Sequence, residues 1–426
     1  MKKIITLAAA SVLVAGSVMA QPKINVSFKM KSNIVSTNFD KWTFLDYGGY
    51  GAIASGLLFS MGTDNVGIEL EMDPYIAFNR TADEWFKNFS LEKYNAWVSF
   101  GRAGSFFLRM GSWDGRSLNC VTDGALLMDG IDFSVYNPGM ISSITTKNLS
   151  MDISSQCGSS SSKKLGAMFQ FKNGPFEIRA GAMNLNFLGD ENTGDSNLAV
   201  TDKLVFGVDT FMAEAGFTLK NVGKVTATGK FAKEELALAA FYEPAFPFLK
   251  NLTALVGFTG EYKNKNKTTA AGKDLWGFGI DFRARYVFDR SISVTTINNF
   301  TMNQRDVASG IENGIAMENM VNMLYNVHPR KNDLKVYLNV RHYTGMDAAE
   351  NGYKPTLLTV AESGDTSKLD WVSNFRITNA FEYKFSENAK LDAGIAFNIL
   401  NCFSNQATAN DPHFDVQIPL VFQVSF

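Results

Sequence analysis

Cysteine and long apolar runs are both scarce in this sequence. It holds only 3 Cys among 426 residues, which excludes a fold held together by a disulfide framework. Cys120 and Cys157 could pair across loops, but their spacing alone leaves the connectivity open. After the first twenty residues there is no run of about 18 or more apolar residues, and the mean hydropathy is −0.06. These absences exclude a helical membrane protein.

Histidine is equally rare. The 3 histidines, His328, His342 and His413, have no Ser, Cys or Asp partner at a spacing typical of a hydrolytic dyad or triad. The sequence has no phosphate-binding loop and no zinc-type cluster of Cys and His. We therefore expect no enzyme activity, no cofactor and no metal site. A catalytic barrel of the phospholipase or protease kind is the remaining enzymatic alternative.

The first twenty residues have the pattern of a secretory signal peptide. Lys2 and Lys3 precede an apolar run that ends at Val18, and small residues end the segment at Ala20. We expect residues 1–20 to be removed and residues 21–426 to form a single domain, because no linker divides them. Without the two leader lysines, 38 basic residues face 42 acidic ones, a net charge of −4. This mild acidity argues against a nucleic-acid partner.

Phenylalanine, by contrast, is abundant, with 35 residues in a chain whose aromatic content is 13%. The final stretch, Phe414–Phe426, is apolar at every even position and mostly polar at the odd ones. Alternation with a period of two predicts a strand with one apolar and one polar face. Lys23–Ile34 shows the same alternation, so we expect the first and last strands to pair and close a sheet. Pro419 is unexpected inside such a strand.

Alternating segments recur along the whole chain. They predict strands at 23–34, 50–61, 65–78, 92–101, 104–111, 126–136, 140–154, 164–172, 175–185, 204–219, 224–232, 235–243, 252–263, 274–288, 291–303, 314–327, 333–344, 370–385, 390–400 and 413–426. Short turns rich in Gly, Asn, Asp and Pro alternate with long polar loops at 35–49, 79–91, 112–125, 186–203, 264–273, 304–313, 345–369 and 401–412. We therefore expect short turns at one rim of the sheet and long loops at the other. An irregular apolar set in 204–219 predicts a bulge or an inward-facing aromatic residue.

Several strands separate aromatic residues from charged ones. In 274–288, Trp276, Phe278 and Phe282 lie on one face, opposite Asp281 and Arg283. The polar faces are expected to line an interior, and the candidate lining residues are Glu69, Glu71, Asp73, Glu177, Arg179, Asp281, Arg283, Arg285, Arg341, Arg376 and Glu382. Acidic and basic clusters on different arcs of one wall would create a transverse field that orients polar solutes. Scattered charge that merely keeps the interior wet is the alternative.

The signal peptide, the alternation and the terminal aromatic residue together resemble bacterial outer-membrane β-barrel proteins, in particular diffusion porins. The resemblance implies an all-β fold, namely a transmembrane antiparallel up-and-down β-barrel of about 18–20 strands, with a range of about 16–20. Eighteen is expected if 224–243 is a false hairpin. It also implies that Phe422, Val424 and Phe426 form the C-terminal signal that the barrel assembly machinery reads.

In diffusion porins the third long loop folds inward and narrows the channel. Carried over by position, this makes Asp114, Arg116 and Asp123 candidate constriction residues. An ordinary external loop is the alternative, because the chain lacks the acidic loop signature of the best-known porins.

We therefore expect an outer-membrane porin through which small hydrophilic solutes or ions diffuse passively along a charged aqueous lumen. Outer-membrane lipid surrounds such a barrel, and the resemblance suggests a homotrimer. One alternative is a surface-exposed barrel whose loops serve as an adhesin or variable surface antigen. Another is a transporter of hydrophobic compounds. Conductance discriminates between these classes, since only an open aqueous lumen passes a large ionic current.

Overall fold

The computed structural model describes residues 23–37, 42–46, 52–63, 65–74, 76–77, 89–112, 165–186, 207–232, 235–263, 274–307, 310–347, 370–400 and 413–425. Several expected features lie outside these residues: the signal peptide, the strands at 126–136 and 140–154, the cysteine pair Cys120 and Cys157, the constriction residues Asp114, Arg116 and Asp123, and the final Phe426.

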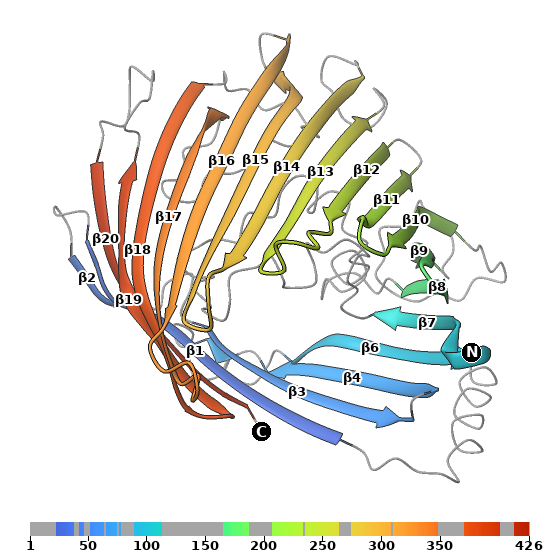
Figure 1. Ribbon diagram of the computed structural model, residues 1–426, viewed down its shortest axis with the longest axis horizontal. Coiled ribbons are helices and arrows are strands. Elements are labelled where there is room, and N and C mark those ends of the chain that lie inside the picture. Colours follow the sequence, from blue (N-terminus) through green and yellow to red (C-terminus); the bar gives the residue numbers. More distant parts are fainter. Residues whose placement is uncertain are drawn as a thin grey trace.

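Eighteen antiparallel strands form one closed sheet (Figure 1). In the order in which they follow each other around the wall, they are β1 (Lys23–Thr37), β3 (Ala52–Gly62), β4 (Val66–Pro74), β6 (Phe89–Phe100), β7 (Phe106–Ser112), β8 (Leu165–Asn173), β9 (Phe176–Asn186), β10 (Gly207–Leu219), β11 (Gly223–Ala232), β12 (Glu235–Pro244), β13 (Leu252–Lys263), β14 (Leu275–Val287), β15 (Ile292–Val307), β16 (Gly310–Asn326), β17 (Leu334–Asp347), β18 (Asp370–Ser386), β19 (Ala389–Leu400) and β20 (His413–Ser425).

Three short elements extend this wall. The strand β2 (Trp42–Asp46) pairs with the end of β1, β5 (Ile76–Ala77) pairs with β3, and a single 3₁₀ turn, η2 (Arg102–Gly104), joins β6 to β7. Within the described residues, no helix is long and apolar enough to cross a membrane.

The first and last strands close the sheet, as the sequence predicts. β1 pairs with β20 from Ser27 opposite Ser425 to Thr37 opposite Val416. Because antiparallel pairing continues from β1 through every neighbour back to β20, the wall of eighteen strands has no free edge. Figure 1 shows the blue β1 beside the red C-terminal strands.

A bulge in β1 explains how Pro419 fits into the last strand. Asn33 faces Pro419, but Val35 faces Ile418, so Ile34 is one residue in excess on β1. On the other side of β20, the register with β19 stops at Leu420 and resumes at Gln417. Proline has no N–H to donate to a ladder, and the bulge and the interruption both fall at the position where that donor is missing.

The connections alternate between the two rims, as expected. Short turns join the strands after Gly62 and at 101–105, 174–175, 220–222, 245–251, 288–291, 327–333 and 387–388, and we call this end the short-turn rim. Two expectations are wrong. The segment 224–243 is no false hairpin, because β11 and β12 pair along their whole length. The expected long loop at 304–313 is mostly strand, because β15 continues to Val307 and β16 begins at Gly310.

Two further details concern the strand count and the irregular strand. β7 pairs directly with β8, although the sequence predicts two strands between them. β10 pairs with β9 and β11 without a register shift, so no bulge interrupts residues 207–219.

The two faces of the wall differ in the way that lipid requires. In β14, Ile280 and Phe282 are 44% and 43% exposed, whereas Asp281 and Arg283, between and beside them, are each 1% exposed. Exposed apolar residues around buried charges are the reverse of a water-soluble sheet. The apolar face is therefore outward and lipid-facing, and the polar face is inward. This finding confirms the predicted transmembrane barrel and excludes a soluble sandwich.

Candidate functional site

Arginines from three strands form a row on the inward face. Arg283 of β14 is connected through Ile297 and Met320, its successive register partners, to Arg341 of β17. Arg341 in turn is the direct partner of Arg376 of β18. All three arginines are buried. Such a row of guanidinium groups needs nearby acceptors, because like charges directly opposite each other destabilise a sheet.

The next row supplies these acceptors. Asp281, Asn299 and Glu318 are register partners on β14, β15 and β16. Glu318 accepts a hydrogen bond from Arg341 and forms an ion pair with it, and Arg283 Nη2 lies 3.9 Å from Asp281 Oδ2. With its amide nitrogen turned toward β14, Asn299 donates to Asp281. Carboxylates and guanidiniums thus interleave across β14–β17.

Between the arginine row and the short-turn rim, the inward face has further polar residues. Arg285 leads a row whose members on the next three strands are Thr295, Asn322 and Asn339. Farther along the wall, Arg376 Nη2 donates to Gln417 Oε1 at 3.2 Å, which connects β18 to the last strand. The inward face of this half of the barrel is therefore polar over several successive rows.

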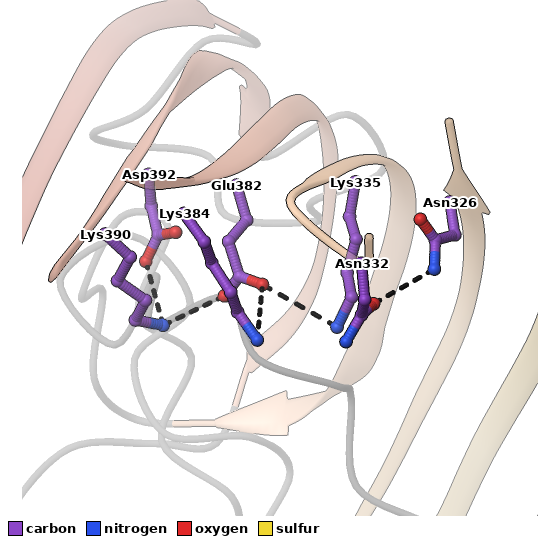
Figure 2. Close-up of polar contacts among 7 residues, drawn as sticks. All are labelled: Asn326, Asn332, Lys335, Glu382, Lys384, Lys390 and Asp392. Atoms are coloured by element: carbon purple, nitrogen blue, oxygen red, sulfur yellow. Dashed lines mark hydrogen bonds and ion pairs between the residues drawn. The ribbon is translucent and has the colours of Figure 1, made fainter. Parts of the chain in front are cut away.

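A second charged cluster surrounds Glu382 near the short-turn rim (Figure 2). The Glu382 carboxylate is 3.0 Å from Lys390 Nζ, 3.6 Å from Lys335 Nζ and 4.0 Å from Lys384 Nζ. Lys390 Nζ also lies 3.4 Å from Asp392. Glu382 is the register partner of Asp392, and Lys384 is the register partner of Lys390. The repulsion within each like-charged pair is compensated by the opposite charges of the pair beside it.

The lysine cluster is the set Lys335, Lys384, Lys390, Glu382 and Asp392. It has one positive charge in excess, and its side chains come from β17, β18 and β19. Its carboxylates are nearly inaccessible, whereas Lys384 is 37% exposed. The excess charge therefore lies where a solute can approach it. Beside the cluster, Asn326 donates to Asn332 of the adjoining turn at 3.0 Å (Figure 2).

Glu69, the first of the early acidic residues, is paired with a basic residue. Arg109 of β7 donates to Glu69 of β4 at 2.5 Å and to Asn95 of β6 at 2.8 Å, and Asn95 donates to Glu69 at 3.2 Å. Glu71 and Asp73 also belong to β4, but their side chains lie outside the described part of the structure. The separation of acidic and basic charge onto different arcs is thus wrong at Glu69, which is paired with a base.

The next strands repeat this pairing of opposite charges. Gln170 of β8 donates to Glu177 of β9 at 2.6 Å, and Arg179 Nη2 lies 3.8 Å from the same carboxylate. Arg179 is the register partner of the buried Glu214 on β10. Two carboxylates therefore flank Arg179.

Sequence reasoning placed the predicted lining residues on the correct strands but missed several of their partners. The missed residues are Arg109, Glu214, Glu318, Lys335, Lys390 and Asp392. In the sequence, each of these residues is a charged residue at one of the polar positions of an alternating strand. Which of these charges meet depends on cross-strand register, which alternation does not give.

The three histidines lie apart from these clusters. His328 is in a turn of the short-turn rim, where its Nδ1 is 2.8 Å from Asp333 Oδ1. His342 lies on the outward face of β17, and His413 begins β20.

Comparison with known proteins gives the fold a context. No protein-family model and no curated protein matches the sequence. Among solved structures, OccK3 of Pseudomonas aeruginosa has a TM-score of 0.51 at 11% identity, over 95% of this chain and 96% of that one. OccAB1 of Acinetobacter baumannii has a TM-score of 0.51 at 11% identity, over 95% and 97%. OccK11 of Pseudomonas aeruginosa has a TM-score of 0.51 at 8% identity, over 95% and 96%.

At these identities the similarity concerns the fold. Together with the closed wall and its outward apolar face, it shows that the chain is a transmembrane β-barrel of the bacterial outer-membrane type, similar in fold to porins.

Proposed function

We propose that the barrel is a passive diffusion channel for small hydrophilic solutes or ions across the outer membrane. The observation that supports this function best is the chemistry of the inward face, where charges and amides from many strands line one interior. An interior that only had to hold the barrel together could be filled with apolar side chains at less cost in desolvation. A polar wall serves a solute that must exchange part of its hydration shell for protein groups.

The charged rows suggest how passage is controlled. Asp281, Arg283 and Glu318 have almost no accessible surface, so they act on a solute through their field more than by direct contact. The lysine cluster is more accessible, and its excess positive charge favours entry of anions near the short-turn rim. We therefore expect a weak preference for anions, set at the lysine cluster. The proposed mechanism involves no covalent chemistry.

Other expected features complete the proposal. Residues 1–20 would direct export, and Phe422, Val424 and Phe426 would be read by the barrel assembly machinery. Asp114, Arg116 and Asp123 would narrow the lumen if the third long loop folds inward. The resemblance to porins suggests a homotrimer.

Single-channel conductance in a planar lipid bilayer tests the function. Purified protein is folded into detergent, its folding is checked by a heat-dependent shift on a denaturing gel, and a salt gradient is applied across the bilayer. Stable current steps with a reversal potential on the anion side are the expected result. Folded protein that gives no steps would contradict the channel, and the long loops would then be the functional surface, as in an adhesin.

A charge-reversal pair tests the site. Lys384→Glu, in the lysine cluster, should move the reversal potential toward cations. Lys250→Glu makes the same change of charge in an exposed turn of the same rim and serves as the control. Equal shifts for both variants would mean that the lysine cluster has no special role in selectivity.

A further inference from the structure

Polar side chains interrupt the outward face of the barrel on four adjacent strands. On β10–β14, β19 and β20, every outward residue whose side chain is described is aliphatic, aromatic, proline or glycine. On β15–β18 the outward positions also include Thr296, Asn298, Asn319, His342, Thr344, Ser373 and Asn379. These four strands lie side by side and are coloured from light orange to red-orange in Figure 1.

Cross-strand register gathers the central members of this set into one row. Asn298 of β15 faces Asn319 of β16, and Asn319 faces His342 of β17. We call Asn298, Asn319 and His342 the outward polar row. His342 faces Phe375 of β18, whose ring it stacks on with a centroid distance of 4.2 Å and an interplanar angle of 18°.

The outward polar row lies inside the apolar band. On β16, the residues two positions before and after Asn319 on the same face are Met317 and Val321, both exposed. On β15, Phe300 follows Asn298 on the same face. Lipid headgroups lie above and below such a band, so they do not supply hydrogen bonds to Asn319, which has apolar neighbours on both sides.

The row satisfies only part of its hydrogen-bonding capacity within the wall. Asn298 Nδ2 donates to Thr296 Oγ1 at 3.1 Å, and His342 Nε2 lies 3.0 Å from Ser373 Oγ. The Asn319 side chain makes no hydrogen bond to another described residue. Each unsatisfied polar group in hydrocarbon costs on the order of several kcal/mol. A partner that offers donors and acceptors inside the membrane removes that cost.

We propose that the outward polar row is the surface through which this barrel contacts a second copy of itself in the membrane. An Asn amide carries both a donor and an acceptor, so the amides of two copies can hydrogen-bond to each other. The same patch on both partners is self-complementary, as a two-fold contact requires. Such a contact gives a dimer, so the proposed assembly differs from the homotrimer that the resemblance to porins suggests. The Met and Val side chains beside the row supply apolar area that packs at the same contact. This assembly is independent of whether the lumen conducts.

Cysteine cross-linking in the membrane tests which surface makes the contact. In a background with Cys120, Cys157 and Cys402 replaced by Ser, Asn319→Cys is treated with a mild oxidant or a short bifunctional maleimide in lipid vesicles. The expected product has twice the mass of the chain. Ala215→Cys, an exposed outward position on β10, is the control and should stay monomeric. No product from Asn319→Cys, or equal products from both variants, would overturn the proposal.

A second variant tests the role of the amides themselves. Asn298→Leu with Asn319→Leu should weaken self-association about tenfold, because hydrogen bonds between membrane segments contribute about 1–2 kcal/mol in favourable cases. Sedimentation in detergent, or energy transfer between labelled copies in vesicles, gives the association constant. Ile280→Leu, on the outward face of β14, is the matched control. Heat-dependent gel mobility shows that each variant is folded. Unchanged association of the leucine pair would contradict the assigned role of the amides.

Discussion

Arg341 and Arg376 are direct cross-strand partners on the inward face, and they are only 7% and 4% exposed. Two buried guanidiniums in this position repel each other unless each has an acceptor. Arg341 has the Glu318 carboxylate, and Arg376 donates to Gln417. The pair is therefore maintained by groups on strands to either side of it, which makes the inward charges one coupled system rather than independent lining residues.

Neutralising Glu318 should lower the stability of the barrel. Glu318→Gln removes the carboxylate that pairs with Arg341, and breaking a buried ion pair costs about 3–5 kcal/mol, less where lumen water reaches the site. The variant should also become more selective for anions. Urea unfolding followed by tryptophan fluorescence and the reversal potential in a salt gradient measure the two effects. Glu387→Gln, in the exposed turn between β18 and β19, should change neither, and equal effects of both would contradict the prediction.

Neutralising Glu382 should make stability depend on salt. In Glu382→Gln the lysines at 335, 384 and 390 lose the carboxylate that all three contact, so their mutual repulsion grows. The urea midpoint should fall at low ionic strength and recover toward that of the wild type at about 1 M salt, where the Debye length is about 3 Å. Adding Lys384→Gln to this variant should recover most of the lost stability at low salt. A loss that salt does not change would mean that repulsion is not its cause.

The turn at 327–333 should loosen in acid. The hydrogen bond from His328 lowers the pKa of the Asp333 carboxyl below its usual value, and the positive charge of the imidazolium adds to the effect. Because this pKa is lowered in the folded protein, the ionised Asp333 carboxylate stabilises the folded turn above the ordinary Asp pKa. This stabilisation is lost as the pH falls through the lowered value. His328→Ala should therefore raise the Asp333 pKa, measured by carboxyl ¹³C NMR in detergent micelles. Lys331→Ala removes a charge that lowers the Asp333 pKa by a smaller amount, so this variant should raise that pKa less. A larger shift in Lys331→Ala would contradict the assignment.

Deleting Ile34 should disrupt the closure of the barrel. The deletion removes the extra residue opposite Pro419, so Val35–Thr37 slip by one position and turn to the other face of the sheet. Less protein should show the gel mobility of the folded barrel. Ile34→Ala keeps the backbone bulge and should fold like the wild type. Combining the deletion with Pro419→Val, which supplies the missing N–H, should recover part of the yield, and a deletion that folds normally would refute the role of the bulge.

The barrel itself was predictable because strand alternation is a local signal. In Phe414–Phe426 and in 274–288 the apolar residues recur with a period of two, so the faces could be assigned without knowing any neighbour. The pairing of the first and last strands followed from the same pattern. The two errors have local causes as well. Lys233 and Glu234 are not turn-forming residues. Gln304, Arg305 and Asp306 are polar, as loop residues often are, although β15 continues through them to Val307.

The contacts of the candidate site were not predictable in the same way. Arg109 and Glu69 are 40 residues apart in sequence, and they meet because β6 aligns β4 and β7 in one register. The outward polar row is a similar case, since Asn298, Asn319 and His342 are unremarkable one at a time. Only the register of β15, β16 and β17 places them next to each other.

The pairing of β1 with β20 also bears on how the wall forms. Ser27 and Ser425 are partners although almost the whole chain lies between them. Bringing the ends of so long a segment together carries a large loop-closure entropy, and such non-local pairing slows folding. Until β1 and β20 form their hydrogen bonds, the sheet has two free edges that can pair with other chains. Closure of β1 on β20 is therefore the step at which an aggregation-prone open sheet becomes a protected barrel, and the rate of that step should set the yield of folded protein.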